Sequence, residues 1–185
     1  MVDIIPLFES YSNKCLIIVD VQEPFKKWWI KNGKPNLVDD INKYCMEFPQ
    51  VYQIWDCHDE TEPSYNFPNQ VLTLKKYYGK ILNDTDIETY FEGEELQKVR
   101  DMFRTKIFNK ELFKTKDDTY SYILYVGGSH KWFFASKELV DTLQSMDANI
   151  TVVGGAEREC LEDVEVLLNL LGKHSTTNYN YTYHA

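Results

Sequence analysis

A cysteine that follows a predicted buried strand and two glycines is the strongest chemical feature of the sequence. The run Val152–Leu161 (VVGGAERECL) predicts a strand that ends at the glycines and a helix that begins near Cys160. A helix N-terminus stabilises negative charge, so it lowers a thiol pKa, and its N–H groups can stabilise an oxyanion. This pattern is typical of a nucleophile. A buried structural cysteine is the alternative; Glu157 and Glu159 oppose thiol activation, whereas Arg158 favours it.

Two aspartates stand at the ends of predicted buried strands. Lys14–Asp20 (KCLIIVD) and Val51–Trp55 are short apolar runs, and Asp56 follows the second. In parallel sheets the working site lies at the carboxyl ends of the strands. We therefore expect Asp20, Asp56 and the Cys160 loop to meet at one rim. Asp20 is then a proton acceptor, with a helix cap or turn former as the alternative.

The tetrad Trp55–His58 (WDCH) offers a pair of metal ligands. Asp56 and His58 have a spacing that can hold a divalent ion at a strand end. Two ligands do not make a closed site, although Glu60 or Glu62 could complete one. The preferred interpretation is a structural hydrogen bond between the aspartate and the histidine. We expect no required cofactor, with a divalent metal as the alternative.

The composition restricts the class of protein. The 185 residues carry a net charge of −9, with 43% hydrophobic and 15% aromatic residues, which suits one packed domain. The acidic balance argues against a nucleic-acid partner, because phosphate binding needs a basic face. The sequence contains no apolar run of membrane-spanning length and no signal-peptide pattern at its N-terminus. We expect a cytoplasmic protein with reduced thiols and no membrane partner.

Strands and helices alternate along the chain. The predicted strands are 14–20, 51–55, 120–126, 149–153 and 178–183, and the predicted helices are 36–48, 94–103, 136–146 and 157–171. This alternation indicates an α/β fold with a mostly parallel sheet that is covered on both faces. Residues 57–92 are broken by proline, asparagine and glycine, and residues 105–118 are basic and irregular.

The segment Ser129–Phe134 (SHKWFF) lies beside the expected rim. His130 and Trp132 could bind a planar or anionic substrate by charge and stacking. The alternative is a helix-entry segment that packs Trp132 and Phe134 into the core. For Phe134 we prefer the core.

Two motifs at matching positions resemble the isochorismatase-like cysteine hydrolases, which include the nicotinamidases. The first strand ends in a D-x-Q motif (IIVDVQ, 17–22), and the nucleophile motif is VVGGAERECLEDV (152–164). The resemblance extends over residues 14–183, although Glu157 stands where the family often has threonine. It implies a single domain over residues 1–185, folded as a three-layer sandwich, with an irregular elaboration at about 57–118.

The resemblance implies a triad of aspartate, lysine and cysteine. Asp20 would accept the thiol proton, Cys160 would attack a carbonyl carbon, and a lysine would support both charges. The lysine of the family closes the strand before the helix that leads to the nucleophile strand. Lys131 is the nearest ammonium to that point and is our first choice, and Lys106 is the rival.

The resemblance also implies a cis peptide bond between Gly155 and Ala156. The N–H groups of Ala156 and Cys160 would then form the oxyanion hole. We assign Gly155 and Ala156 to substrate binding, together with His130 and Trp132. The family often self-associates, so a homo-oligomer is among the expectations.

We therefore expect a small-molecule hydrolase that acts on an amide C–N bond through Cys160. Its main partner is a small-molecule substrate. The alternative is a catalytically inactive protein of the same fold that binds a small ligand or a protein partner. Two observations motivate the alternative: the lysine has rival positions, and two glutamates flank the nucleophile position.

Overall fold

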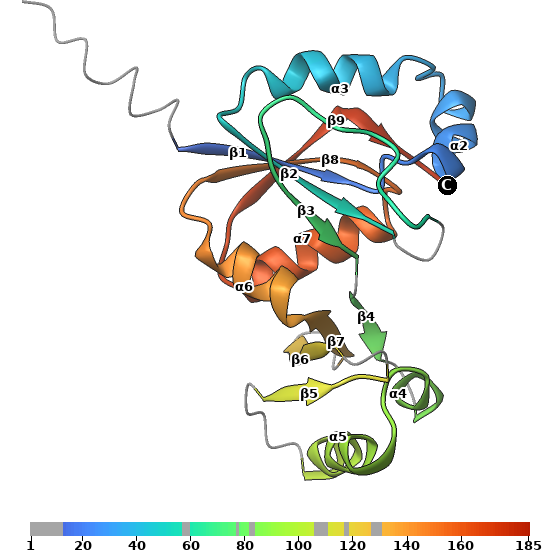
Figure 1. Ribbon diagram of the computed structural model, residues 1–185, viewed down its shortest axis with the longest axis vertical. Helices are drawn as coiled ribbons and strands as arrows, with labels where there is room; N and C mark the ends of the chain where they lie inside the picture. Colours follow the sequence, from blue (N-terminus) through green and yellow to red (C-terminus); the bar gives the residue numbers. More distant parts are fainter. Residues whose placement is uncertain are drawn as a thin grey trace, which may run out of the picture. The chain divides into compact units, whose positions relative to one another are not determined.

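A computed structural model describes residues 13–56, 60–76, 78–81, 84–105, 111–116, 119–126 and 131–185. The chain divides into two compact units (Figure 1). Met1–Lys76 and Ser145–Ala185 together form the first unit, and Tyr77–Gln144 forms the second. Each of the two units contains a β-sheet.

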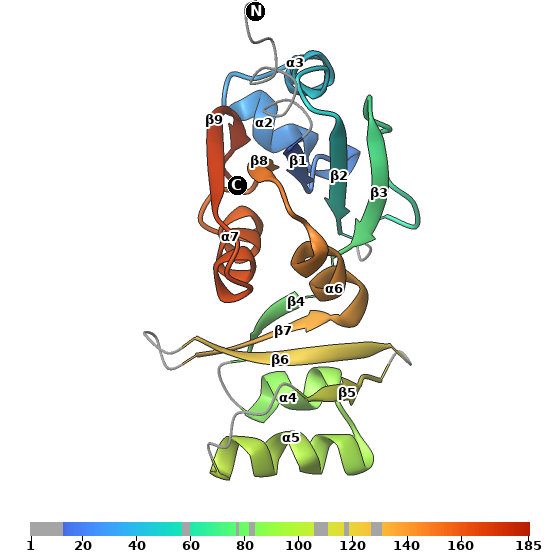
Figure 2. The same cartoon turned by 90° about the vertical axis from the view of Figure 1, so that its left-hand side faces the viewer.

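The first unit contains a five-stranded sheet in the order β3-β2-β1-β8-β9, with parallel pairing throughout (Figure 2). Its strands are β1 (Lys14–Val19), β2 (Gln50–Trp55), β3 (Gln70–Lys75), β8 (Asn149–Gly155) and β9 (Ser175–Tyr183). The central strand β1 is fully buried from Cys15 to Val19, as expected for a strand covered on both faces. The predicted α/β class with a mostly parallel sheet is confirmed.

Helices cover the sheet of the first unit on two sides (Figure 1). One side carries the 3₁₀ turn η1 (Glu23–Phe25), α2 (Lys26–Lys31) and α3 (Leu37–Cys45); the other carries α7 (Cys160–Leu170). The apolar face of α3 packs into a core that includes Leu16 and Ile18 of β1. In the described part of the chain, no helix is long and apolar enough to cross a membrane.

The second unit has a four-stranded antiparallel sheet in the order β4-β7-β6-β5. Its elements in chain order are β4 (Tyr78–Ile81), α4 (Asp84–Tyr90), α5 (Gly93–Thr105), β5 (Leu112–Lys114), β6 (Tyr120–Val126), β7 (Lys131–Ser136) and α6 (Lys137–Ser145). Phe91, Val99 and Phe134 belong to its core. The preferred core position of Phe134 is therefore confirmed.

The strand predicted at 120–126 exists, but it lies in the antiparallel sheet rather than in the parallel one. It pairs with β7, which includes residues for which a helix-entry segment was one of our two interpretations. This pairing sets Ile123 opposite Phe134, and both side chains are buried in the second core. A strand that follows closely in the chain offers an antiparallel partner without a crossover, so local pairing prevails here.

Candidate active site

All five strands of the parallel sheet end in residues that surround one site. In the order of the strands across the sheet, these residues are Lys76 after β3, Asp56 after β2, Asp20 after β1, Gly155 at the end of β8 and Tyr183 at the end of β9. Because parallel strands share one carboxyl edge, side chains far apart in sequence are brought together there. The predicted rim of Asp20, Asp56 and the Cys160 loop is present.

The Lys76 ammonium is the centre of this group. Its Nζ donates to Asp20 Oδ2 at 3.0 Å, lies 2.6 Å from Cys160 Sγ, and lies 3.5 Å from Asp56 Oδ2. The Asp20 side chain is 1% exposed and that of Lys76 is 15% exposed. The Asp20 carboxylate also interacts with the Cys160 thiol. Asp20, Lys76 and Cys160 thus form a closed set of pairwise contacts in a largely water-excluded place.

Hydrogen bonds hold the main chain of Asp20 through both its N–H group and its carbonyl. Its N–H donates to the carbonyl of Ile54 on β2 at 2.9 Å, which extends the pairing of the two strands beyond β1. Its carbonyl accepts a hydrogen bond from the Tyr183 hydroxyl at 2.6 Å. The backbone of Asp20 has a φ of 48°, in the left-handed region that non-glycine residues seldom adopt. These two bonds hold this conformation in place.

Cys160 is presented by the turn between β8 and α7. The Gly155–Ala156 peptide bond is cis, as the resemblance implied. The carbonyl of Ala156 accepts hydrogen bonds from the N–H groups of Glu159 at 3.2 Å and Leu161 at 3.1 Å. Cys160 is the first residue of α7 and is partly exposed, so its sulfur lies at the positive end of the helix and within reach of a ligand.

The ionisation of the three groups follows from burial and charge. Burial raises the pKa of Asp20 to about 6, although the Lys76 ammonium opposes the rise. Burial disfavours the charged form of Lys76, but the charges of Asp20 and Cys160 outweigh it and raise the Lys76 pKa. Burial and the Asp20 charge raise the pKa of Cys160 to about 11, against the effect of Lys76. Near pH 7 the site therefore holds a carboxylate, an ammonium and a neutral thiol.

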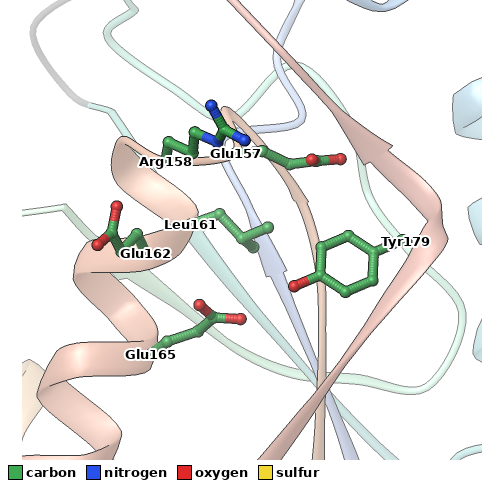
Figure 3. Close-up of a pocket in the computed structure, with 6 residues that line it drawn as sticks. All are labelled: Glu157, Arg158, Leu161, Glu162, Glu165 and Tyr179. Atoms are coloured by element: carbon green, nitrogen blue, oxygen red, sulfur yellow. The ribbon is translucent and has the colours of Figure 1, made fainter.

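Glu157, one of the two glutamates beside the nucleophile position, has its carboxylate bound by residues of the C-terminal segment. Its carboxylate accepts a hydrogen bond from the Thr182 hydroxyl and lies 3.3 Å from His184 Nε2. Figure 3 shows the Glu157 side chain extending from the turn toward β9. Glu159 lies nearer to the site, because it helps to line the pocket at Cys160. Of the two glutamates, Glu159 is thus the one placed to contact a ligand.

The proposed metal ligand Asp56 pairs with a cation of the protein itself. Its carboxylate contacts Lys76, and its main chain exchanges two hydrogen bonds with the buried Gln22 side chain, at 2.6 and 3.0 Å. Gln22 also donates to Glu60 at 3.1 Å. His58 lies outside the described residues. Within the described ranges, no group of three or more potential ligands could hold a metal ion.

Two pockets lie near the turn, and the smaller one opens on the reactive groups. A pocket of about 90 Å³ is lined by Asp20, Phe25, Trp28, Ala156, Glu159, Cys160, Tyr183 and Ala185. A larger pocket of about 550 Å³ lies beside α7, between Glu162 and Glu165 on the helix and Tyr179 on β9 (Figure 3). The larger pocket is lined by neither Cys160 nor Asp20, whereas both line the small aromatic-walled pocket.

The structure brings together Asp20, Cys160, Gly155 and Ala156 of the predicted site residues, at one edge of the first unit. The lysine differs from the prediction. Lys131 begins β7 of the second unit, with Trp132 beside it, whereas the ammonium that contacts Asp20 and Cys160 is that of Lys76. Lys106 and His130 lie outside the described residues.

Lys76 could have been found from one signal in the sequence. It ends the run Val71–Lys76 (VLTLKK), which has the composition of a short strand. This run falls within the segment 57–92 that proline, asparagine and glycine made hard to interpret. Once β3 is paired beside β2, Lys76 must lie at the carboxyl edge; its N–H donates to the carbonyl of Trp55 at 2.6 Å.

Comparison of the chain with known proteins gives no significant match to a protein-family model, a curated protein or a solved structure. The geometry of the site is therefore the basis for assigning its chemistry.

Proposed function

We propose that the protein is a small-molecule hydrolase that cleaves an amide C–N bond with Cys160 as nucleophile. Its first unit would be an isochorismatase-like three-layer sandwich. The observation that supports this best is the position of Lys76 Nζ, 3.0 Å from Asp20 and 2.6 Å from Cys160. A nucleophile, a proton acceptor and a cation within mutual contact form the set of groups that acyl transfer requires.

The proposed reaction proceeds through a thioester. As Cys160 Sγ attacks the carbonyl carbon, Asp20 takes the thiol proton, which its pKa of about 6 allows at neutral pH. Asp20 then gives this proton to the departing amine as the C–N bond breaks. Water next attacks the thioester, with Asp20 again as base, and releases the carboxylic acid and the free thiol. Lys76 stays charged throughout and stabilises the carboxylate and the developing thiolate.

The oxyanion of each tetrahedral intermediate would be stabilised by the N–H groups of Ala156 and Cys160. These groups belong to the turn at the start of α7, where the helix dipole also favours negative charge. Phe25, Trp28 and Tyr183 line the adjoining pocket, and such walls suit a small planar acyl group. In this mechanism the triad supplies the nucleophile and the acid–base group, so no metal is required.

The direct test is a panel of small primary amides, including nicotinamide, benzamide and acetamide. Ammonia release is measured with the wild type, Cys160→Ala and Cys45→Ala; Cys45 is a buried thiol of the core and serves as the matched control. We expect turnover of at least one amide by the wild type and Cys45→Ala, and none by Cys160→Ala. Intact mass spectrometry should then show an acyl adduct on Cys160. Turnover that survives in Cys160→Ala would refute the thioester mechanism.

The second candidate is a protein of the same fold that binds a small ligand without turnover. The observation that favours it is the neutral resting thiol, because burial raises the pKa of Cys160 to about 11. This candidate predicts saturable binding of a panel compound with no ammonia release and no acyl adduct. The same panel therefore discriminates between the two.

A further inference from the structure

We propose that Tyr183 is a positioning residue of this site, which holds the base Asp20 through its hydroxyl and the nucleophile turn through its ring. This inference rests on the proposed function of the triad. Tyr183 is the last residue of β9 and is 2% exposed. It contacts both the end of β1, through the Asp20 carbonyl, and the end of β8, through Gly155.

The Tyr183 hydroxyl contacts the main-chain carbonyl of Asp20 rather than its carboxylate. It donates to the Asp20 carbonyl at 2.6 Å, and the bond is buried. Asp20 adopts a φ of 48°, so the direction of its carboxylate depends on what holds this peptide. The N–H group of Asp20 donates to the carbonyl of Ile54, and the carbonyl of Asp20 accepts from the Tyr183 hydroxyl. Without the hydroxyl, the carboxylate loses one of two restraints on its aim at Lys76 and Cys160.

The ring and the main chain of Tyr183 act on the turn that carries Cys160. Gly155 pairs with Tyr183 across the sheet, and a Cβ added to Gly155 would lie 2.6 Å from the ring. The Tyr183 carbonyl accepts the N–H of Glu157 at 2.8 Å. Trp29 packs edge-on against the ring, with the ring centroids 5.5 Å apart, and helps to fix its position. One side chain thus sets the separation between the base and the nucleophile turn.

The Tyr183 hydroxyl remains a donor over the working range of pH. Burial, followed by the charges of Asp20, Cys160 and Glu159, raises its pKa far above the ordinary value of a tyrosine. It therefore does not exchange a proton with the substrate, and its role is to orient Asp20.

The test compares the reaction of Cys160 with iodoacetamide from pH 5 to 9 in the wild type, Tyr183→Phe, Tyr181→Phe and Asp20→Asn. Peptide mass spectrometry follows Cys160 alone. Tyr181 is the matched control, because it lies on the same strand but stacks on Tyr44, away from the site. Tyr183→Phe keeps the ring, so we expect it to fold, with a thermal midpoint lower by about 5 °C.

We expect Tyr183→Phe to react about fivefold more slowly at pH 7, the effect of one hydrogen bond. The rise in rate near pH 6 should also weaken, whereas Tyr181→Phe should match the wild type. Asp20→Asn/Tyr183→Phe should react no more slowly than Asp20→Asn, because Tyr183 acts through Asp20. Trp29→Phe retains the hydroxyl but loosens the ring, and it should weaken the pH 6 rise in the same direction.

A wild-type rate and pH profile in Tyr183→Phe, or additive effects in the double variant, would overturn the positioning role. If Asp20→Asn does react more slowly than the wild type, the proposed triad survives that result. If Asp20→Asn reacts like the wild type, the triad itself fails and the role of Tyr183 fails with it. A lower thermal midpoint with unchanged kinetics would identify Tyr183 as structural only.

Discussion

The Lys76 ammonium lies 2.6 Å from the sulfur of Cys160, a residue 84 positions further along the chain. The same ammonium binds the carboxylate of Asp20, so one cation connects the proposed base and the proposed nucleophile. Opposite charge favours the ionised forms of both partners, whereas burial disfavours them. The balance leaves Asp20 ionised and Cys160 protonated near neutral pH, which is the starting state that proton transfer to Asp20 requires.

Replacement of this cation should slow the reaction of Cys160. In Lys76→Met the thiolate loses its nearest positive charge, so we expect alkylation by iodoacetamide at pH 7 to fall by about tenfold, equivalent to one unit of thiol pKa. Lys75→Met is the matched control, because Lys75 is the exposed neighbour at the end of β3. Lys131→Met tests the lysine expected from the sequence. Slow alkylation in Lys131→Met with a normal rate in Lys76→Met would reverse our assignment.

The rate of Cys160 alkylation should rise as the pH passes through about 6. Below this value Asp20 is protonated and cannot accept the thiol proton; above it the carboxylate can. Titration of Cys160 itself, near pH 11, lies above the range of the measurement. Rates from pH 4.5 to 8.5 in the wild type and Asp20→Asn provide the test. We expect the wild-type rate to rise up to about pH 6 and then to level off, whereas the Asp20→Asn rate should rise about tenfold per pH unit throughout, as the thiolate fraction does below the thiol pKa. A wild-type profile with no change of slope near pH 6 would contradict the role of Asp20 as base.

Asp20 should also make stability depend on pH. Folding raises its pKa from the ordinary 3.8 to about 6, so the folded state binds the proton more tightly. Its contribution to the free energy of unfolding is therefore complete below about pH 4. As the pH rises through 6, this contribution of roughly 3 kcal/mol is lost. Urea unfolding at pH 4 and pH 7 measures this as a change in the stability difference between the wild type and Asp20→Asn. Equal differences at the two pH values would show that Asp20 titrates normally.

The contact between Gly155 and Tyr183 predicts intolerance of any side chain at position 155. In Gly155→Ala the new methyl group would lie 2.6 Å from the ring, and we expect the free energy of unfolding to fall by roughly 3 kcal/mol. Gly33→Ala is the control: Gly33 has a positive φ but no atom within 4 Å of its added Cβ, so about 1 kcal/mol is expected. Similar losses in both variants would mean that the ring can move.

The positions of Asp20 and Cys160 in the fold could be predicted because their signals are local. β1 and β8 are continuous apolar runs, and α7 begins close after the glycines that end β8, so Asp20 and Cys160 follow from the pattern alone. Their meeting at one edge follows from the rule for parallel sheets. The cis bond at Gly155–Ala156 came from the resemblance rather than from any pattern.

The lysine is only weakly indicated by the sequence, because it depends on an edge strand. β3 lies at the edge of the sheet, with Val71 at 56% and Leu72 at 38% exposure, so its apolar residues mark no single buried face. Pairing with β2 rather than side-chain burial defines this strand, and pairing is not visible in one sequence. The antiparallel sheet of the second unit was missed for a related reason. β7 is defined by its pairing with β6, and a single sequence does not show that pairing.

The neighbouring positions of β1 and β8 carry a consequence for the folding of the chain. Lys14 pairs with Asn149, so the two central strands close a loop that includes the whole second unit. Contacts of such long sequence separation are costly in loop entropy and slow to form. A nascent chain that ends before residue 145 contains Asp20 and Lys76 but no β8 and no Cys160. The Cys160 thiol therefore reports on this pairing, because it reaches Asp20 and Lys76 only when β8 lies beside β1.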